Sequence, residues 1–409
     1  MNKRVRFYPE HHFREQAERV YQRHRNRILA TFPQAEIHHI GSTAVEGSLT
    51  KGDVDLQVRI REEQFLPCKG FLLHHYSINT GSTQTHDFCA FETNHEIAVG
   101  IQLTVKNSSS DFFFKMTRFF VENPAYTQDY NQLKKDYDGA DMEDYLQAKA
   151  AFLTRMQTSE KYKQLLCKLD LYQKVKFVEG ENFVTIEETK HLTTEELPEL
   201  IHHLAEDPIL KKVNHLSIVV KHPYSSSIEE CMKKHGFSHH DTMITVKKDL
   251  AYHQKRDCPF TFKSLPEISE EAFILTWERC MSGSLNSPSY LNMKEQMGSI
   301  KKEIGPAYEQ SCKIAYEGDQ PAGVVIPHIE EGTKVEGRLF YFGMMPEARG
   351  KGKGALLHYE ALTILKDEFK ALYNVGGTSI HNIPMQKVFL RNGCEEEERN
   401  SVYRRSMEG

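Results

Sequence analysis

The sequence predicts a chain of several domains of the α/β and α+β classes, and three observations support this prediction. The chain has 409 residues, more than one ordinary hydrophobic core accommodates. Strand-like and helix-like runs alternate through its second half. Two places where such runs meet have residues typical of binding sites. One has a pair of aspartates before residue 56, and the other has a basic, glycine-rich turn near residue 350.

Composition narrows the class of protein. Charged residues make up 27% and hydrophobic residues 39% of the chain, as in soluble globular proteins. A net charge of −5 argues against general nucleic-acid binding, which needs a concentrated basic surface. The first residues lack the apolar core of a signal peptide, and no run approaches the roughly 18 apolar residues of a membrane span. We therefore expect a cytoplasmic protein without membrane or nucleic-acid partners, and the oligomeric state is not predicted.

Cysteines and histidines give no metal signal. Eight cysteines are scattered without a CxxC pair or other ligand spacing, so we expect reduced thiols. Several histidines occur in adjacent pairs, but neighbouring residues point in different directions on a helix or a strand. We expect no zinc.

The first junction lies in residues 37–58. Gly41 and Ser42 form a turn, and Asp53 and Asp55 come at the start of a strand with alternating apolar residues. The alternation places both aspartates on one face. Two carboxylates there could hold Mg²⁺ against nucleotide phosphates, and the turn offers a backbone N–H group and a hydroxyl to a phosphate. The arrangement resembles that of the nucleotidyltransferase fold.

A more specific resemblance covers about the first 155 residues. Residues 39–47, HIGSTAVEG, resemble the HIGSTAVPG signature of the GrpB-like (UPF0157) family, with Glu46 in place of the proline. Two later segments resemble the C-terminal helices of that family, with Tyr130, Lys134 and Lys149 among the residues of the recurring type. The resemblance implies a GrpB-like domain with a nucleotidyltransferase-like fold.

This domain is expected over residues 1–157, and its reaction stays open because a fold does not establish a function. Active nucleotidyltransferases carry a third carboxylate on a neighbouring strand. Here that strand offers Glu96 at its start and the neutral Gln102 in its middle. Nucleotide transfer that depends on Mg²⁺ bound by Asp53 and Asp55, and binding without transfer, are both retained as alternatives.

The second junction, residues 339–354, is typical of a buried strand that leads through a basic loop into a helix. Glycines let backbone N–H groups close on an anion, and the first turn of the helix adds unpaired N–H groups and a partial positive charge. The junction predicts a pyrophosphate site.

Arg349, Gly352 and Gly354 fill the pattern Arg/Gln-x-x-Gly-x-Gly/Ala, so the junction resembles motif A of the GNAT acetyltransferases. Asn382, expected on a following strand, matches an asparagine that contacts CoA in that family. The resemblance implies a GNAT domain over residues 258–409 that transfers the acetyl group of acetyl-CoA to a primary amine. The cofactor-binding residues that it implies are Met344, Met345, Arg349, Gly350, Lys351, Gly352, Lys353, Gly354 and Asn382.

The middle of the chain predicts a connecting helix and an internal repeat. Residues 158–177 have apolar residues at helical spacing. A strand, a helix, a glycine turn and a second strand follow, and this order returns in residues 379–405. Residues 178–252 are therefore expected to form a degenerate GNAT-like half domain, in which residues 203–217 take the place of the glycine loop and CoA does not bind.

The residues for proton transfer are less evident. An amine with a pKa of about 10 must lose a proton before it attacks, so a base is needed. The glutamate that GNAT enzymes often place on the strand before motif A is missing, and Tyr341, the polar side chain there, is one candidate catalytic residue. His381 is a candidate base because an imidazole has a near-neutral pKa. Phe389 replaces the family's acid tyrosine, and the pair Glu330-Glu331 predicts only an exposed turn.

The sequence thus predicts a nucleotidyltransferase-like domain followed by tandem GNAT folds, the first degenerate. The expected function is N-acetylation of an unidentified small-molecule amine with acetyl-CoA. Two alternatives stay open: a Mg²⁺-dependent nucleotidyltransferase in the N-terminal domain, and a protein that binds acyl-CoA without catalysis.

Overall fold

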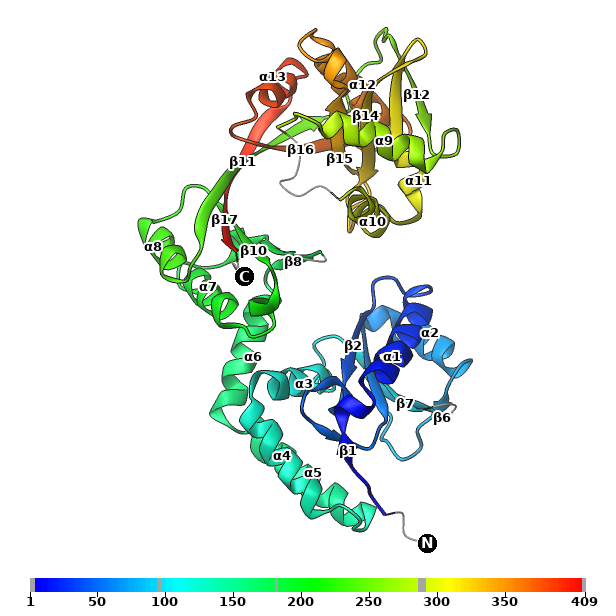
Figure 1. The fold of residues 1–409 in the computed structure, drawn as a ribbon, viewed down its shortest axis with the longest axis vertical. Helices are drawn as coiled ribbons and strands as arrows, with labels where there is room; N and C mark the ends of the chain where they lie inside the picture. Colours follow the sequence, from blue (N-terminus) through cyan, green and yellow to red (C-terminus); the bar gives the residue numbers. More distant parts are fainter. Residues whose placement is uncertain (1–3, 95–96, 181–182, 286–291, 407–409) are drawn as a thin grey trace. The chain divides into compact units, whose positions relative to one another are not determined.

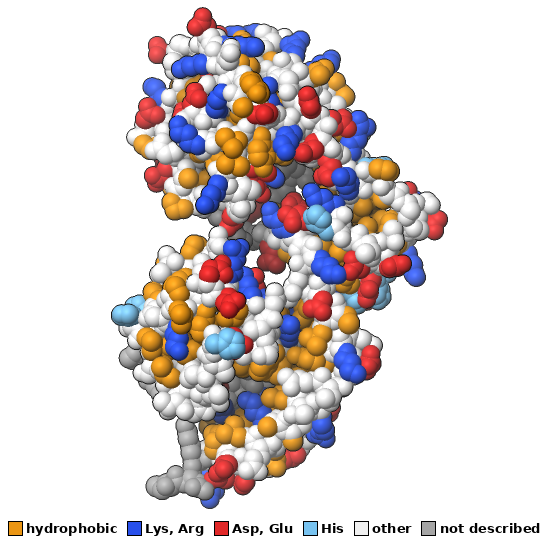
Figure 2. All heavy atoms as spheres, turned by 180° about the vertical axis from the view of Figure 1, so that it is seen from behind, with side chains coloured by type: hydrophobic (Ala, Val, Ile, Leu, Met, Phe, Trp, Pro, Cys, Tyr) orange, Lys and Arg blue, Asp and Glu red, His pale blue; other side chains and the backbone are white. Residues whose placement is uncertain are grey.

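A computed structural model describes residues 4–94, 97–180, 183–285 and 292–406. The chain has two compact units, Met1–Leu171 and Tyr172–Gly409. Within the described ranges, no helix is both long and apolar enough to cross a bilayer. On the face shown in Figure 2, acidic and basic side chains are interspersed and form no single basic area.

The first unit is built on a five-stranded sheet with the order β2-β4-β7-β6-β5. Its strands β2, β6 and β7 are labelled in Figure 1. β4 and β7 are parallel neighbours, and the other pairs are antiparallel. Outside this sheet, β1 (Tyr8–Pro9) pairs with β3 (Leu49–Thr50). The strands of the sheet are β2 (Glu36–Ile40), β4 (Val54–Ile60), β5 (Ser77–Ile78), β6 (Phe88–Asn94) and β7 (Ala98–Val105).

The alternation along β4 separates a core from a polar face, as the sequence predicts. Val54 and Leu56 pack with residues of α1 (Arg14–Leu29) and α2 (Glu62–Leu73). Gln57 faces the other side, where its side chain accepts a hydrogen bond from the backbone of Phe114. Four helices follow the sheet in the sequence: α3 (Phe113–Glu122), α4 (Pro124–Asp136), α5 (Met142–Gln157) and α6 (Glu160–Tyr172).

The second unit contains a ten-stranded sheet with the order β12-β13-β14-β15-β16-β11-β17-β10-β9-β8. Its strands are β8 (Lys176–Glu179), β9 (Phe183–Glu187), β10 (His215–Lys221), β11 (Ser238–Asp249), β12 (Phe260–Ser264), β13 (Lys313–Glu317), β14 (Gln320–Ile329), β15 (Glu336–Met344), β16 (Tyr373–Ser379) and β17 (Glu395–Ser406). Its helices are α7 (Glu196–Glu206), α8 (Ser226–Lys234), α9 (Glu270–Met281), α10 (Met293–Ile304), α11 (Tyr308–Ser311), α12 (Lys353–Asp367) and α13 (Ile383–Arg391).

Helices cover both faces of the later strands of this sheet. Trp277 of α9 packs with Val324 and Tyr341 on one face. Leu357 of α12 packs with Val325 and other apolar residues on the opposite face. The strand, glycine loop and helix predicted over residues 339–365 are therefore present, as β15 and α12.

The predicted repeat exchanges its last strands. β10-α8-β11 and β16-α13-β17 have the same strand-helix-strand order. Yet β11 pairs with β16 of the other copy, β17 pairs with β10, and β11 and β17 lie side by side at the centre (Figure 1). The predicted boundary between residues 252 and 258 thus falls inside one continuous sheet.

Two other expectations differ from the structure. Asn382 is not on a strand: β16 ends at Ser379, and the side chain of Asn382 accepts a hydrogen bond from the backbone of Met385 at the start of α13. In the first copy, the strand-to-helix turn that corresponds to the glycine loop lies between β9 and α7, at residues 188–195. The segment 203–217 instead includes the end of α7 and the start of β10, and the sequence misplaced the turn because it contains no glycine.

Candidate functional site

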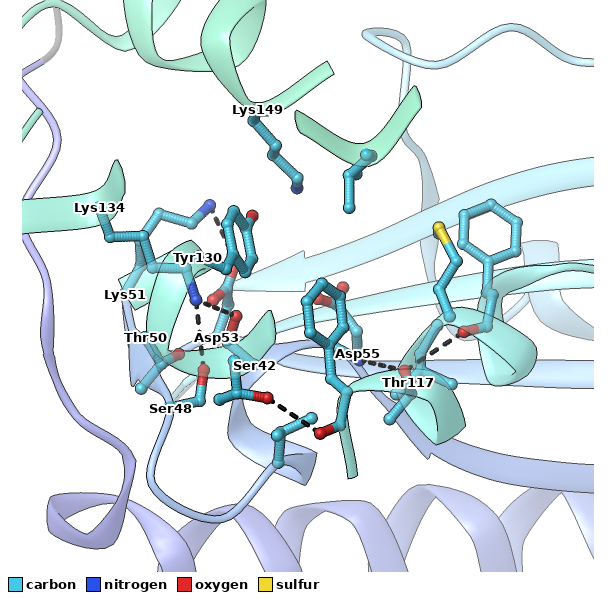
Figure 3. A pocket seen from close by; sticks show the side chains of 18 of the residues that line it. Ser42, Ser48, Thr50, Lys51, Asp53, Asp55, Thr117, Tyr130, Lys134 and Lys149 are labelled. Atoms are coloured by element: carbon cyan, nitrogen blue, oxygen red, sulfur yellow. Dashed lines mark hydrogen bonds and ion pairs between the residues drawn. The ribbon is translucent and has the colours of Figure 1, made fainter. Parts of the chain in front are cut away.

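A pocket of about 440 Å³ lies in the first unit, within the size range of small-molecule sites (Figure 3). It opens beside the polar face of β4, and α3, α4 and α5 supply its other walls. The four residues that the sequence predicted to bind a nucleotide or Mg²⁺ in this unit all line it: Gly41, Ser42, Asp53 and Asp55. The turn and the two aspartates, twelve residues apart in sequence, thus belong to one site.

Glycines hold the carboxylate of Asp55 in place. Gly41 has a φ of 77°, and a Cβ there would lie 2.8 Å from Oδ2 of Asp55. Gly100 of β7 is the register partner of Asp55, and a Cβ there would lie 2.4 Å from Oδ1. Both oxygens of Asp55 therefore lie against glycine backbone that no other residue could provide. Burial, and then the charge of Asp53, raises the pKa of Asp55.

Three lysines surround these carboxylates. Lys51 forms an ion pair of 3.0 Å with Asp53. Lys134, only 1% exposed, donates to Oγ of Ser42 at 2.8 Å and to Oγ of Ser48 at 3.2 Å. Lys149 points from α5 into the pocket (Figure 3), and its Nζ has no hydrogen-bond or ion-pair partner among the described residues. These lysines come from segments that lie up to about a hundred residues apart.

The pocket alters the protonation of these lysines. Burial, and then the charge of Lys149, lowers the pKa of Lys134 to about 7. Burial also lowers the pKa of Lys149, although Asp55 opposes the shift. For Lys51 the effect of burial is outweighed by Asp53 and Asp55, and the pKa is raised. Perturbed pKa values of this kind gather at functional sites.

The pocket also has an aromatic wall. Phe112 and Phe113 line the pocket, are half-buried, and stack on each other with ring centroids 4.3 Å apart. Phe120 and Tyr130, which also line it, stack at 5.4 Å. The pocket therefore combines basic and aromatic side chains, and Lys134 lies directly over the ring of Tyr130.

The second unit holds the glycine loop between β15 and α12. Gly350 and Gly352 both have a φ of 74°, in the left-handed region that favours glycine. Among the described residues, a Cβ at either position would meet nothing within 4 Å, so none of them covers either glycine. The first turn of α12 leaves backbone N–H groups without helical acceptors.

The basic side chains of the loop are occupied within the fold. Arg349 donates to the carbonyls of Met344 at 3.1 Å, Ser282 at 2.8 Å and Cys280 at 2.8 Å. Lys353 donates to both carboxylate oxygens of Glu317. Lys351 is exposed. Any anion held here would thus be bound mainly by the backbone.

A cleft begins where β15 and β16 separate. The two strands pair in parallel at Glu336↔Tyr373 and Gly337↔Asn374 only. Beyond these pairs β15 continues beside β14 as far as Met344, whereas β16 continues beside β11 as far as Ser379. Backbone groups of β15 from Arg338 onward therefore have no strand partner on the cleft side. A cavity of about 710 Å³ includes residues of both strands.

A histidine with two carboxylates lies in this cavity. Nε2 of His328 is 3.8 Å from Glu330 and 3.9 Å from Glu303. His328 is 3% exposed, and neither ring nitrogen has a hydrogen-bond partner among the described residues. His328, followed by Arg338 and Lys176, holds the pKa of Glu330 low, at about 2. Burial raises the pKa of Glu303.

The residues proposed from sequence for proton transfer lie elsewhere. Tyr341 is buried, and its hydroxyl donates to the carbonyl of Cys280 at 3.0 Å, so it belongs to the core. His381 is exposed beyond the end of β16. Met344 and Met345 are both buried at the end of β15. The sequence had assigned Glu330 to an exposed turn, whereas the structure places it half-buried in the cavity.

Comparison with known proteins bears on the first unit. The family model described as GrpB protein matches residues 10–159. The GrpB resemblance is confirmed. A UPF0157 protein from Vibrio cholerae serotype O1 is 29% identical over 154 residues, which cover 37% of this chain and 81% of that protein. The matched segment contains every lysine and aspartate of the pocket, which is therefore the pocket of a GrpB-like domain.

Solved structures were compared with the whole chain. A GCN5-related N-acetyltransferase from Sphaerobacter thermophilus is 13% identical, with a TM-score of 0.40, over 57% of this chain and 76% of that one. A tandem GNAT protein from the clavulanic acid biosynthesis pathway is 13% identical, with a TM-score of 0.39, over 57% of this chain and 78% of that one.

The pocket of the GrpB-like domain does not fit the Mg²⁺ that the sequence suggested. Asp53 is neutralised by Lys51, and the oxygens of Asp55 lie against Gly41 and Gly100. The neighbouring strand β7 contributes the amide of Gln102 to the pocket. Glu96, the other candidate for a third carboxylate, lies outside the described residues. Across the described ranges, no cluster of three or more His, Cys, Asp or Glu side chains could hold a metal.

The main features that sequence reasoning missed are Lys51 in the first unit and His328 in the second. Lys134 and Lys149 were noticed only as residues of the recurring family type, without a place in the site. All of them depend on which segments the fold brings together, and no local spacing marks them. For His328, the one local indication of a site was the acidic residue Glu330, two positions later in the sequence.

Proposed function

We propose that the second unit is an acetyl-CoA-dependent N-acetyltransferase of the GNAT type, acting on a small-molecule primary amine. The observation that carries this proposal is the separation of β15 and β16 in front of an open glycine loop. Such a cleft offers an unpaired strand edge and a phosphate site at its end. A long cofactor with a pyrophosphate needs both.

In this proposal the backbone from Arg349 to Gly354 and the first turn of α12 hold the pyrophosphate, because helix N-termini favour anions. Arg349 acts as an anchor for the loop through its three carbonyl contacts. The free edge of β15, including the backbone of Met344, pairs with the pantetheine. Bound acetyl-CoA supplies the acetyl group as a reactive thioester.

His328 is proposed as the base. His328 lines the cavity beside the divergence of the strands, with Nε2 3.8–3.9 Å from two carboxylates, and an imidazole can take the proton that the amine must lose. Glu330 and Glu303 on either side would stabilise the imidazolium that forms. The chemistry otherwise rests on placement of the amine against the thioester.

The amine is proposed to be cationic and polar. The cavity is lined by seven glutamates against five lysines and arginines. A glutamate-rich cavity attracts amines that carry more than one ammonium group. Residues from both copies of the repeat line it, including Glu187 of β9 and Phe340 of β15, so both copies contribute to selection of the substrate.

The first copy is proposed to be the degenerate module. β9 and β10 pair over four residue pairs, from His215↔Phe183 to Ile218↔Ile186, so no cleft opens between them comparable to that between β15 and β16. The turn after β9, at residues 188–195, contains no glycine. The copy therefore offers neither an unpaired edge nor a phosphate loop.

Release of free CoA across a panel of primary amines tests the proposal. His328→Asn should lower kcat by about a hundredfold, the lower end of the usual contribution of a general base, and leave the Kd of acetyl-CoA within about twofold. His381→Asn, at the exposed histidine, should leave kcat unchanged. Tight acetyl-CoA binding without CoA release with any amine would establish a binding protein instead, and absence of binding would remove the assignment.

A further inference from the structure

We infer that the pocket of the GrpB-like domain binds an organic phosphate with a flat aromatic body, that it does so without a divalent cation, and that Lys149 is the residue that contacts the phosphate. This inference concerns the first unit and is independent of the acetyltransferase proposed for the second.

The first argument is the balance of charge. Three lysines and two aspartates line the pocket: Lys51, Lys134, Lys149, Asp53 and Asp55. Lys51 and Asp53 neutralise each other at 3.0 Å. The remaining carboxylate, Asp55, lies against glycine backbone, while the amino groups of Lys134 and Lys149 have no carboxylate within ion-pair distance among the described residues. With three lysines against two aspartates, the pocket has one more basic than acidic side chain. The unsatisfied charge in the pocket is therefore positive, and an anion completes it.

The second argument distinguishes the two free lysines. An ammonium group has three N–H donors. Lys134 uses its donors on the hydroxyls of Ser42 and Ser48 and on the carbonyl of Leu49, and it lies over the ring of Tyr130 at 4.1 Å. Lys134 is thus a positioning residue that fixes the Gly-Ser turn and adds positive potential. Lys149 keeps all three donors for a ligand.

The third argument is the shape of the rest of the pocket. The aromatic wall described above includes the stacked pair Phe112 and Phe113, neither of which is fully buried. Stacking of a nucleobase on an aromatic side chain contributes about 1–3 kcal/mol and is tolerant of base identity. A phosphate at Lys149 and a flat ring on this wall both fit within a cavity of about 440 Å³.

A metal-bridged ligand would require the opposite arrangement. Mg²⁺ binds through carboxylates that face the ligand, so removal of an aspartate charge would abolish binding. In the site inferred here, Asp53 only offsets positive charge, so removal of its charge should strengthen binding of an anion. The two mechanisms therefore predict effects of opposite sign for the same substitution.

Calorimetry with AMP on the full-length protein tests the inference, in EDTA and in Mg²⁺. All titrations use a Gly352→Asp background, in which the glycine loop of the second unit should no longer hold a phosphate. The matched variants are Lys149→Gln, in the pocket, and Lys135→Gln, an exposed neighbour on α4 with the same change of charge. Asp53→Asn tests the sign. Ribose 5-phosphate, which lacks the base, tests the aromatic wall.

AMP should bind in EDTA, and Lys149→Gln should raise its Kd at least tenfold, whereas Lys135→Gln should leave it within twofold. Asp53→Asn should bind AMP at least as tightly as the unaltered chain, and ribose 5-phosphate should bind at least tenfold more weakly than AMP. Because no described residue forms a hydrogen bond or ion pair with Lys149, its replacement should not lower Tm. Binding that requires Mg²⁺ and disappears in Asp53→Asn would overturn the inference, as would AMP binding unaffected by Lys149→Gln, or no saturable binding of AMP in either buffer.

Discussion

Replacement of Gly352 by aspartate should remove acetyl-CoA binding from the second unit. Gly352 precedes the first residue of α12, with a φ of 74° and open space where a Cβ would stand. The substitution introduces two separable effects: strain in the backbone and a negative charge at the place proposed for the pyrophosphate. No side-chain clash contributes, because nothing lies within 4 Å of the new Cβ.

The magnitudes of the two effects differ. A residue with a Cβ in the left-handed region loses roughly 1 kcal/mol, and aspartate tolerates that region better than most residues. A carboxylate at about 5 Å from a phosphate charge, with an effective dielectric constant of about 20, adds roughly 3 kcal/mol of repulsion for each charge. Charge therefore dominates, and a loss of affinity of at least a hundredfold follows, since 1.4 kcal/mol corresponds to about tenfold.

Calorimetry with acetyl-CoA, together with thermal unfolding, measures this loss. Gly352→Asn has nearly the same shape without the charge, and should weaken binding by about fivefold or less. Gly332→Asp is the matched control, because Gly332 has a φ of 82°, is equally open, and lies in the turn between β14 and β15 away from the loop. An affinity of Gly352→Asp within threefold of that of Gly332→Asp would refute the assignment of the loop to a phosphate.

Three further substitutions test how buried polar and charged side chains contribute to the stability of the two units. Arg349→Lys should lower the free energy of unfolding by about 2–4 kcal/mol, because lysine cannot donate to the three separate carbonyls that accept from Arg349. A loss of acetyl-CoA affinity without loss of stability would show that the guanidinium contacts the ligand instead. The pKa of Lys134 is lowered to about 7 in the fold, so between pH 7 and 9 the unfolded chain holds the extra proton. In urea titrations the unaltered chain should then gain roughly 2–3 kcal/mol relative to Lys134→Met over this range, and a constant difference would contradict the lowered pKa. Glu122→Gln removes the carboxylate that accepts from Lys168, whose side chain is 8% exposed. In the same urea titration it should lower the free energy of unfolding by about 3 kcal/mol. A decrease below about 1 kcal/mol would mean that water or another group replaces the ion pair.

The features that the sequence predicts well are those encoded by neighbouring residues. The Gly-Ser turn with its two aspartates and the basic glycine loop each lie within about twenty residues, and each is found where expected, at one end of β4 and between β15 and α12. Local periodicity also predicts α6, because its buried Leu165 and Leu169 follow helical spacing. In these cases the residues that define the motif are close in the sequence, so the local sequence pattern is enough to predict the local structure.

The features that the sequence misses depend on distant segments. Lys149 joins Asp55 in one pocket only because the fold brings α5 and β4, about a hundred residues apart in the sequence, to the same cavity. His328 faces Glu303 across parts of the chain that share no motif. Asn382 was placed on a strand because its segment resembles the second half of the GNAT family, whereas the following Ile383-Pro384 begins a helix, where proline is well tolerated.

The exchange of β11 and β17 between the two copies of the repeat affects how the second unit folds during synthesis on the ribosome. β11 ends at Asp249, and its partner β16 begins only at Tyr373, so more than a hundred residues must be synthesised before β11 can be covered on that edge. At about 5–20 residues per second, the ribosome exposes this edge for several seconds or longer. During that interval a twelve-residue strand stands ready to pair with any other chain. Folding of the second unit therefore depends on keeping β11 apart from other nascent chains until the end of translation.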